Sequence, residues 1–417
     1  MMYARAGRQV ILGTFLLAWA CAACGSRTDE PSTTVRDSAG IEIVESQHPR
    51  WQEGEAWTLS PDPVLEIGVS EGEDPYLLDR VMGVVRFEDG TVVVANRGDN
   101  TLRYYDGTGR FLHSAGGSGG GPTEFSQMMG LRRLGDNVVA WQLWVNRSKV
   151  FDLQGNLVRA MLAPTQPANI LGIFDDGSHL FGVFAPAMST QAELRLDSTL
   201  LYLSTPDFSD ADSIARLPAA YVVGIELGDQ RIPYPQEYGP IRVVAAGADE
   251  WYYGWPETYE FQVLDRDANV RRIVRRTWDP LPVTDADRQR HRESMLNQPA
   301  TGGSQRQRPP SAQQRSIVDV MVYPDHHPAF QRIYPDPSGH VWVELPDPAH
   351  PPKGRRLTPV RDAPTTWDVF DPSGAWLGSV EFPARFFVFE IGEGYVAGVW
   401  KDEVDVERVR VYELVKP

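Results

Sequence analysis

The chain has 417 residues, of which 42% are hydrophobic, and its formal net charge is −16 at pH 7. This length is sufficient for a large folded core, and the excess of acidic residues argues against a nucleic-acid partner, whose phosphates would be repelled. The chain has two cysteines, Cys21 and Cys24. Because both lie close to the N-terminus, we expect no disulfide bond in the main body of the chain.

Residues 1–23 have the pattern of a lipoprotein signal peptide. Arg5 and Arg8 precede an apolar stretch, Val10–Ala20, that is shorter than the ~20 residues needed to span a bilayer. Small residues then precede Cys24 and resemble the bacterial lipobox. We therefore predict cleavage before Cys24 and attachment of a diacylglyceryl group to it, which would connect the protein to a membrane through this lipid anchor.

Two alternatives to this anchor remain open. Modification of Cys21 would place the bulky Trp19 within the motif, and an ordinary secretory signal would leave both cysteines incidental. With Cys24 acylated, the polar residues 24–40 are predicted to form a flexible tether. Gly25 follows the cysteine where an Asp would resemble an inner-membrane sorting signal, so the expected location is the outer membrane of the cell envelope.

Beyond the tether, residues 41–417 show short β-branched or aromatic runs separated by Asp-Gly-type turns. In the clearest unit, residues 84–114, four such runs are divided by two turns, Glu88-Asp89-Gly90 and Asp106–Gly109, and by a link between the second and third runs. Five further units resemble it to differing degrees, at residues 131–159, 170–216, 241–273, 330–377 and 386–414. Repeats of ~40–50 residues built from short strands are typical of a β-propeller.

We therefore predict an all-β fold, a six-bladed β-propeller of four-stranded blades. A propeller needs its ring closed, because an open ring exposes unpaired strand edges. The isolated apolar segment Val64–Ile67 is predicted to complete the last blade by pairing near residues 395–412. Ile41–Val44 is expected to contribute to the same closure.

The repeat pattern is interrupted at about residues 279–329. Residues 285–296 are predicted to form a short helix, with Thr284 and two aspartates at its N-terminal end. Residues 297–315 are rich in Gln, Gly, Pro and Ser, and we expect a mobile excursion there. A second long loop, rich in proline, is predicted at residues 346–364.

Residues 84–125 carry a resemblance to a known family. The stretch Gly116–Phe125 reads Gly-Gly-Ser-Gly-Gly-Gly-Pro-Thr-Glu-Phe. It resembles the Gly-Gly-x-Gly-x-Gly-Pro-x-Glu-Phe stretch that follows the first blade in six-bladed β-propeller lipoproteins related to NHL repeats. The resemblance implies a fold and no particular reaction. Propellers related to NHL repeats also include metal-dependent lactonases and lyases, with ligands in the central channel.

The glycine-rich stretch Gly116–Phe125 is the most evident candidate for a site. Its backbone N–H groups would suit an anion, since glycine permits close approach of the main chain. However, it lacks the Gly-Lys-Ser/Thr of a phosphate loop, and no convincing helix follows it. We therefore favour a structural role, a crossing between blades in which Phe125 is buried in the core.

Two other patterns suggest metal ions and are better explained without them. Asp-x-x-Gly turns would suit calcium, but one turn per blade keeps the carboxylates apart, so we expect side-chain-capped turns at Asp106, Asp152, Asp336 and Asp371. His326 and His327 are adjacent and flanked by prolines, which favours a loop over a metal pair. Apart from lipid attachment at Cys24, we assign no catalytic, cofactor-binding or metal-binding residue.

Two functions are compatible with these patterns. The first is an envelope-anchored binding or scaffold module for a protein, peptide or glycan, without a cofactor and without enzymatic activity. The alternative is a metal-dependent enzyme of the lactonase or lyase type, with a divalent metal in the central channel. Acidic or amide side chains converging on the axis would favour the enzyme, whereas arginines and aromatic rings at the channel mouth would favour binding.

Overall fold

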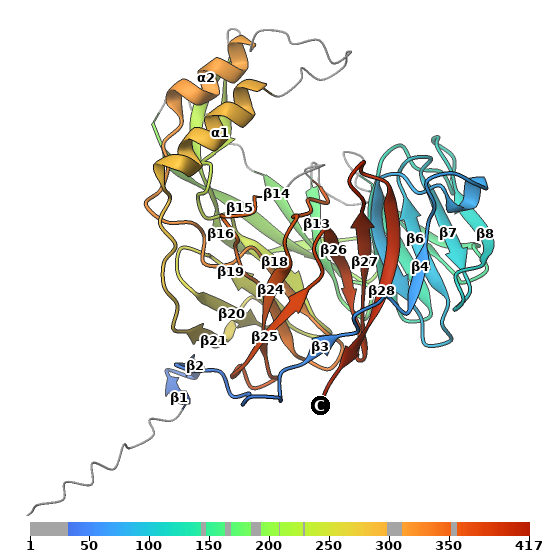
Figure 1. The fold of residues 1–417 in the computed structure, drawn as a ribbon, viewed down its shortest axis with the longest axis horizontal. Helices are drawn as coiled ribbons and strands as arrows, with labels where there is room; N and C mark the ends of the chain where they lie inside the picture. The colour runs from blue at the N-terminus through green and yellow to red at the C-terminus, as the bar shows by residue number, and fades with distance from the viewer. Residues whose placement is uncertain are drawn as a thin grey trace, which may run out of the picture. The chain divides into compact units, whose positions relative to one another are not determined.

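The computed structural model describes residues 32–142, 147–162, 168–184, 193–207, 209–227, 230–297, 311–351 and 357–417. All of them belong to a single unit, Ser32–Pro417. The regular secondary structure of the described residues is β-strand, apart from two α-helices and one short 3₁₀ turn, η1 (Asp74–Tyr76) (Figure 1). The predicted all-β class is therefore confirmed. Among the described residues, neither α-helix is long and apolar enough to span a membrane.

The strands form six sheets that follow one another along the described chain. The first contains β5 (Val81–Arg86), β6 (Val92–Asn96), β7 (Thr101–Tyr105) and β8 (Phe111–Gly116). The second contains β9 (Met128–Leu134), β10 (Asn137–Gln142), β11 (Arg147–Phe151) and β12 (Leu157–Leu162). The third contains β13 (Ala168–Ile173), β14 (His179–Phe184), β15 (Arg195–Ser204), β16 (Ala211–Leu227) and β17 (Gln230–Pro235).

The remaining three sheets include strands from the N-terminal part of the chain. The fourth contains β18 (Val243–Ala246), β19 (Trp251–Gly254), β20 (Glu260–Leu264) and β21 (Val270–Arg276), followed by β2 (Ile41–Ser46) and β1 (Thr33–Ser38). The fifth contains β22 (Arg332–Pro335), β23 (Val341–Glu344), β24 (Thr365–Phe370) and β25 (Trp376–Phe382). The sixth contains β26 (Phe386–Ile391), β27 (Tyr395–Lys401) and β28 (Glu407–Val415), with β3 (Thr58–Leu59) and β4 (Leu65–Ile67) paired to β28.

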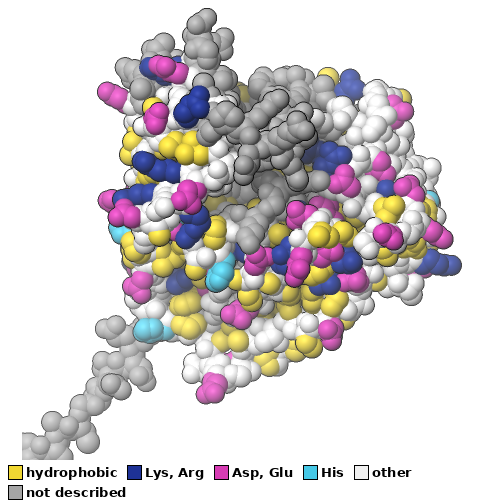
Figure 2. All heavy atoms as spheres, turned by 45° about the horizontal axis from the view of Figure 1, so that its top comes forward, with side chains coloured by type: hydrophobic (Ala, Val, Ile, Leu, Met, Phe, Trp, Pro, Cys, Tyr) yellow, Lys and Arg dark blue, Asp and Glu magenta, His cyan; other side chains and the backbone are white. Residues whose placement is uncertain are grey.

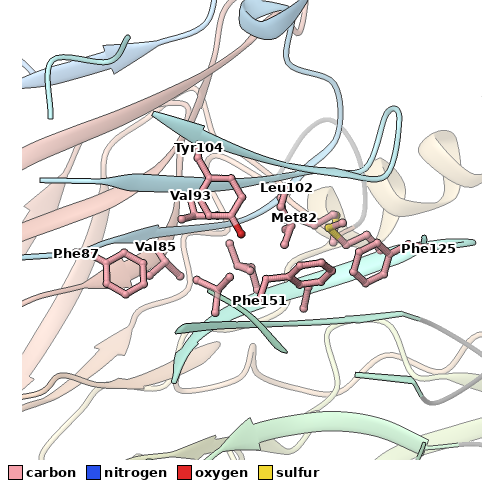
Figure 3. Close-up of a cluster of buried hydrophobic side chains, with 13 residues drawn as sticks. Met82, Val85, Phe87, Val93, Leu102, Tyr104, Phe125 and Phe151 are labelled. Atoms are coloured by element: carbon pink, nitrogen blue, oxygen red, sulfur yellow. The ribbon is translucent and has the colours of Figure 1, made fainter. Parts of the chain in front are cut away.

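Buried apolar clusters lie between consecutive sheets. Figure 3 shows the cluster between the first two sheets, where Val85 and Leu102 of the first meet Phe151 of the second. Comparable clusters join the second sheet to the third, and so on to the sixth, and another joins the sixth to the first. Each sheet thus buries both faces against its neighbours, which is the packing of a β-propeller.

The two N-terminal segments that were expected to close the last blade lie in different sheets. β4 pairs with β28, with Leu65 opposite Val411, as predicted for this segment. β2 instead pairs in parallel with β21 of the fourth sheet, so the prediction for Ile41–Val44 is wrong. Two effects explain the observed partner. Val44 is fully buried there, and Glu42 forms an ion pair with Arg272 of β21.

The end of the predicted tether also differs from the expectation. Residues Thr33–Ser38 lie within the segment 24–40, yet they form β1, which pairs antiparallel with β2. The connecting turn is tight, because Gly40 has a φ of 83° and its N–H donates to Asp37 Oδ1 at 3.2 Å. The expected end of the tether at residue 40 is therefore wrong, because pairing with β2 satisfies the backbone of β1.

The insertion between the fourth and fifth sheets contains both α-helices (Figure 1). α1 (Asp285–Asn297) matches the predicted helix, and the hydroxyl of Thr284 accepts the N–H of Asp287 at 3.2 Å at its start. α2 (Ala312–Val320) begins within the predicted excursion, where Ser311 forms a capping box. Both helices pack against β16 through one buried apolar cluster, which includes Val223, Ile225, Met295, Ile317 and Met321.

Candidate functional site

The first strand of each sheet lies close to the first strands of other sheets. β5 contacts β9 and β26, while β18 contacts β13 and β22. Some of these approaches require glycine, because a Cβ atom on Gly83 would lie 2.5 Å from the Cβ of Leu131, and one on Gly172 would lie 2.4 Å from that of Ala246. The first strands therefore pack together in two groups, β13 with β18 and β22, and β26 with β5 and β9.

Charged side chains interrupt the apolar sequences of three first strands, close to the end of each. They are Arg86 of β5, Arg132 and Arg133 of β9, and Glu390 of β26. Because charged residues are rare in such buried strands unless they have a role, this grouping is a candidate site. Together with the neighbouring rings of Phe87, Tyr334 and Tyr395, these four residues are called the axial cluster below.

Arg132 shows that the cluster extends beyond neighbouring sheets. Its guanidinium carbon lies 5.4 Å from the centre of the Tyr334 ring, which belongs to β22 of the fifth sheet. Arg132 itself belongs to the second sheet, and no buried cluster among the described residues joins these two sheets. The contact therefore joins the first strands of two sheets that are not neighbours. Burial raises the pKa of Tyr334, so its hydroxyl stays protonated.

The other two arginines are also stacked on aromatic rings. The guanidinium carbon of Arg133 lies 4.8 Å from the centre of the Phe87 ring, and its N–H groups donate to the carbonyl oxygen of Arg86. The guanidinium carbon of Arg86 lies 5.0 Å from the centre of the Tyr395 ring, and the Tyr395 hydroxyl donates to the Arg86 carbonyl at 2.9 Å. Stacking covers the face of a guanidinium and leaves its N–H edge available for an anion.

Glu390 is the carboxylate of the cluster, and a β-bulge determines its position. The register of β26 against β27 shifts between Val388 and Glu390, so Phe389 is an extra residue there. A bulge changes the direction of the side chains that follow it. Oε2 of Glu390 accepts the backbone N–H of Arg86 at 2.7 Å. Burial raises the pKa of Glu390 to about 7, although the nearby charges of Arg133 and Arg132 oppose this.

The predicted structural role of the glycine-rich stretch agrees with its contacts. Phe125 is fully buried in the cluster of Figure 3, and its N–H donates to the carbonyl of Gly117 at 2.8 Å. The N–H of Gly121 donates to the carboxylate of Glu124 at 2.8 Å. The stretch therefore binds an anion of its own, the side chain of Glu124, and a Cβ on Gly119 would displace that carboxylate.

The Asp-x-x-Gly turns are capped by their own aspartates, as predicted. Asp106 Oδ1 accepts the backbone N–H groups of Thr108 at 2.9 Å and Arg110 at 3.0 Å. Hydrogen bonding, first of all from the Thr108 side chain, holds the pKa of Asp106 well below its ordinary range. The same pattern of accepted backbone N–H groups recurs at Asp152, Asp336 and Asp371.

The two adjacent histidines lie near the C-terminal end of the insertion. His326 forms an isolated backbone bridge with Pro282. The ring of His327 packs 4.8 Å from that of Tyr238, and its Nε2 lies 3.5 Å from Asp287 Oδ2. Burial lowers the pKa of His327. Over the ranges that the structure describes, no group of three or more His, Cys, Asp or Glu side chains is arranged to hold a metal ion.

The axial cluster was not among the sites predicted from the sequence, and the predicted lipid site, Cys24, lies outside the described residues. The sequence does contain a signal for the cluster. Arg132 and Arg133 stand between two leucines of a strand, and Glu390 interrupts an otherwise apolar run. Charged residues inside the first strand of a propeller repeat are unusual enough to be singled out.

Comparison with known proteins adds information on the fold. No protein-family model and no curated protein matches the chain. A member of the DUF4221 family from Bacteroides vulgatus has a TM-score of 0.50 and 11% sequence identity, with 86% of this chain and 98% of that chain covered. At this identity the likeness concerns the fold alone, and it agrees with a β-propeller.

Two other solved structures are similar at lower scores. A protein of Bacteroides fragilis whose name describes it as exported has a TM-score of 0.48 and 9% identity, with 90% of this chain and all (100%) of that chain covered. Virginiamycin B lyase from Staphylococcus aureus has a TM-score of 0.41 and 10% identity, with 86% of this chain and 100% of that chain covered.

Proposed function

We propose that this chain is a binding module of the cell envelope that holds a carboxylate-bearing protein, peptide or glycan at the axial cluster. The observation that carries the proposal is the group of three guanidiniums, each stacked on an aromatic ring, at the point where first strands meet. Arg132 and Arg133 are exposed and therefore accessible to a ligand. Arginine in this state suits bidentate binding of a carboxylate.

The charge of the cluster supports an anionic ligand. Among the described ion pairs, none involves Arg86, Arg132 or Arg133, although the chain as a whole carries a net charge of −16. By contrast, Arg332 at the start of β22 is bound to Glu344 and lies between two aromatic rings. Acidic and basic side chains are interspersed over the face shown in Figure 2. Three guanidiniums here face one carboxylate, Glu390, so the excess of positive charge would stand out locally and attract anions.

The remaining parts of the proposal concern architecture and location. We infer that the six sheets are the blades of one ring, closed by the pairing of β4 with β28. The chain would belong with the six-bladed propeller lipoproteins that Gly116–Phe125 resembles. Cys24 would carry the lipid anchor and place the propeller at the outer membrane. Binding at the axial cluster uses side chains of the chain itself and requires no cofactor.

A binding measurement on the full-length mature protein tests this function. Isothermal titration with trigalacturonate, a carboxylate-bearing glycan, is expected to show saturable binding that weakens with salt. Replacement of Arg132 and Arg133 by Met should reduce affinity at least about tenfold, because hydrogen bonds to charged groups contribute about 1.5–3 kcal/mol each. The matched control replaces Arg36 and Arg271, two exposed arginines elsewhere, by Met and should leave binding unchanged.

Two outcomes would overturn the proposal. One is that the variant with Met in place of Arg132 and Arg133 binds trigalacturonate as tightly as the control variant does. The other is a stoichiometric divalent metal in the purified protein together with turnover of a lactone, which would support the enzymatic alternative. Metal content is measured on the same preparation by mass spectrometry. Mass analysis of the mature protein separately tests lipid attachment at Cys24.

A further inference from the structure

Glu390 is difficult to reconcile with a site that binds anions and nothing more. Its carboxylate is partly exposed and lies among groups from four other strands, namely Arg86, Arg132, Arg133, Tyr334 and Tyr395. A negative charge at this point repels a simple anion. The Arg86 N–H requires an acceptor, and the neutral amide oxygen of a Gln side chain would serve equally well. The carboxylate therefore requires another explanation.

The chemistry of the cluster offers one. A carboxylate is a strong acceptor with about four lone-pair positions, of which Glu390 uses one for the Arg86 N–H and one for the Tyr395 hydroxyl. The guanidiniums supply only donors, and donors suit the anionic part of a ligand. A ligand that presents a carboxylate and free hydroxyls on one ring would satisfy both kinds of group. A uronic acid has this arrangement on every residue, because each ring carries a carboxylate at C6 and hydroxyls at C2 and C3.

We propose that the axial cluster recognises a uronate-bearing glycan, with the sugar carboxylate on the guanidiniums of Arg132 and Arg133 and a sugar hydroxyl donating to Glu390. This deepens the proposed function and rests on it. Glu390 is then the residue that determines specificity. It accepts a hydrogen bond from a hydroxylated acid and disfavours an acid that has no hydroxyl to donate.

Burial and the bulge support this role. Hydrogen bonds to a charged acceptor strengthen when both groups are shielded from water, and protein surrounds Glu390 on several sides. The bulge at Phe389 places the carboxylate beside the arginines, where its repulsive effect on a plain anion is greatest. Acidic peptides present side-chain carboxylates without hydroxyls and are expected to bind less well.

The test compares two acids with three carboxylates each. Trigalacturonate carries hydroxyls on every ring, whereas tricarballylate has none. Isothermal titration at pH 8 of the full-length mature protein is expected to show at least about tenfold preference for trigalacturonate. Glu390→Gln should reduce this preference about tenfold, because the charged acceptor becomes neutral. Gln keeps an oxygen for the Arg86 N–H, and Glu390→Asp provides a second variant that keeps the charge but withdraws it from the site.

The outcomes separate this inference from the proposed function. If both acids bind equally to the unaltered protein, and Glu390→Gln strengthens both alike, the recognition of hydroxyls is wrong while anion binding stands. If neither acid binds, or replacement of Arg132 and Arg133 by Met has no effect, the proposed function fails and this inference fails with it. Loss of the preference in both Glu390 variants, with unchanged circular dichroism spectra, supports the inference.

Discussion

The charge of Glu390 is predicted to reduce the stability of the folded protein above neutral pH. Burial raises its pKa from 4.5 to about 7 in the folded protein. Between these values the folded state keeps a proton that the unfolded state releases, so the free energy of unfolding falls as pH rises. Each pH unit corresponds to about 1.4 kcal/mol, which gives about 3 kcal/mol over the full interval. Because the carboxylate keeps contact with water, we expect about 2 kcal/mol.

Glu390→Gln isolates this effect, since Gln does not titrate and the other groups are the same in both proteins. The variant should match the unaltered protein at pH 4.5 and become more stable relative to it as pH rises to 8, by about 2 kcal/mol. Urea unfolding followed by tryptophan fluorescence gives both free energies. Glu381→Gln, which alters an exposed carboxylate of β25, serves as control. A difference between variant and unaltered protein that stays constant across this range would refute the reasoning.

Three further replacements test the packing of the sheets by urea unfolding. Phe125→Ala should cost about 3–5 kcal/mol, because the ring is fully buried. Gly83→Ala should cost about 1–3 kcal/mol, since its new Cβ meets the backbone and Cβ of Leu131 and pushes β5 away from β9. Asp368→Asn should cost about 3–5 kcal/mol, because Asp368 is fully buried and pairs with Arg276 at 2.7 Å, joining the fourth and fifth sheets.

The control for these three replacements is the substitution of an exposed residue. Leu112→Ala removes a side chain that is 44% exposed on β8 and should change the free energy of unfolding by no more than about 0.5 kcal/mol. Costs for Phe125→Ala or Gly83→Ala as small as this would contradict the packing between the first two sheets. For Asp368→Asn, a stability within error of the unaltered protein would contradict the buried ion pair.

Local patterns in the sequence explain why the fold class could be predicted. Asp106 and its equivalents occupy turns whose hydrogen bonds are formed within five residues. The repeat of these turns in the sequence therefore indicates where the strands begin and end. The partner of β2 could not be predicted in this way. β2 and β21 are joined in parallel by residues about 230 positions apart, such as Glu42 and Arg272, and nothing local distinguishes β21 from another sheet edge.

The axial cluster depends on the same long-range geometry. The sequence marks Arg132 as a charge within a strand, but its contact with Tyr334 arises only where the first strands of different sheets meet. The sequence marks Glu390 in the same way, but it misplaces the side chain for a different reason. The extra residue Phe389 shifts the alternation of β26, so a strict period of two assigns the carboxylate to the wrong side of the strand. A bulge of this kind has no distinctive residue type in the sequence.

The edge hairpin of β1 and β2 has a mechanical consequence. Tension applied to the chain from the N-terminal side of Ser32 would reach β1 first, at Thr33, which lies opposite Ser46. β1 has one neighbour, so it can be peeled from β2 a few hydrogen bonds at a time. Only after β1 and then β2 had detached would the pull reach β3 and then β4, both of which pair with β28. The hairpin would thus detach first, before the pairing of β4 with β28 came under load.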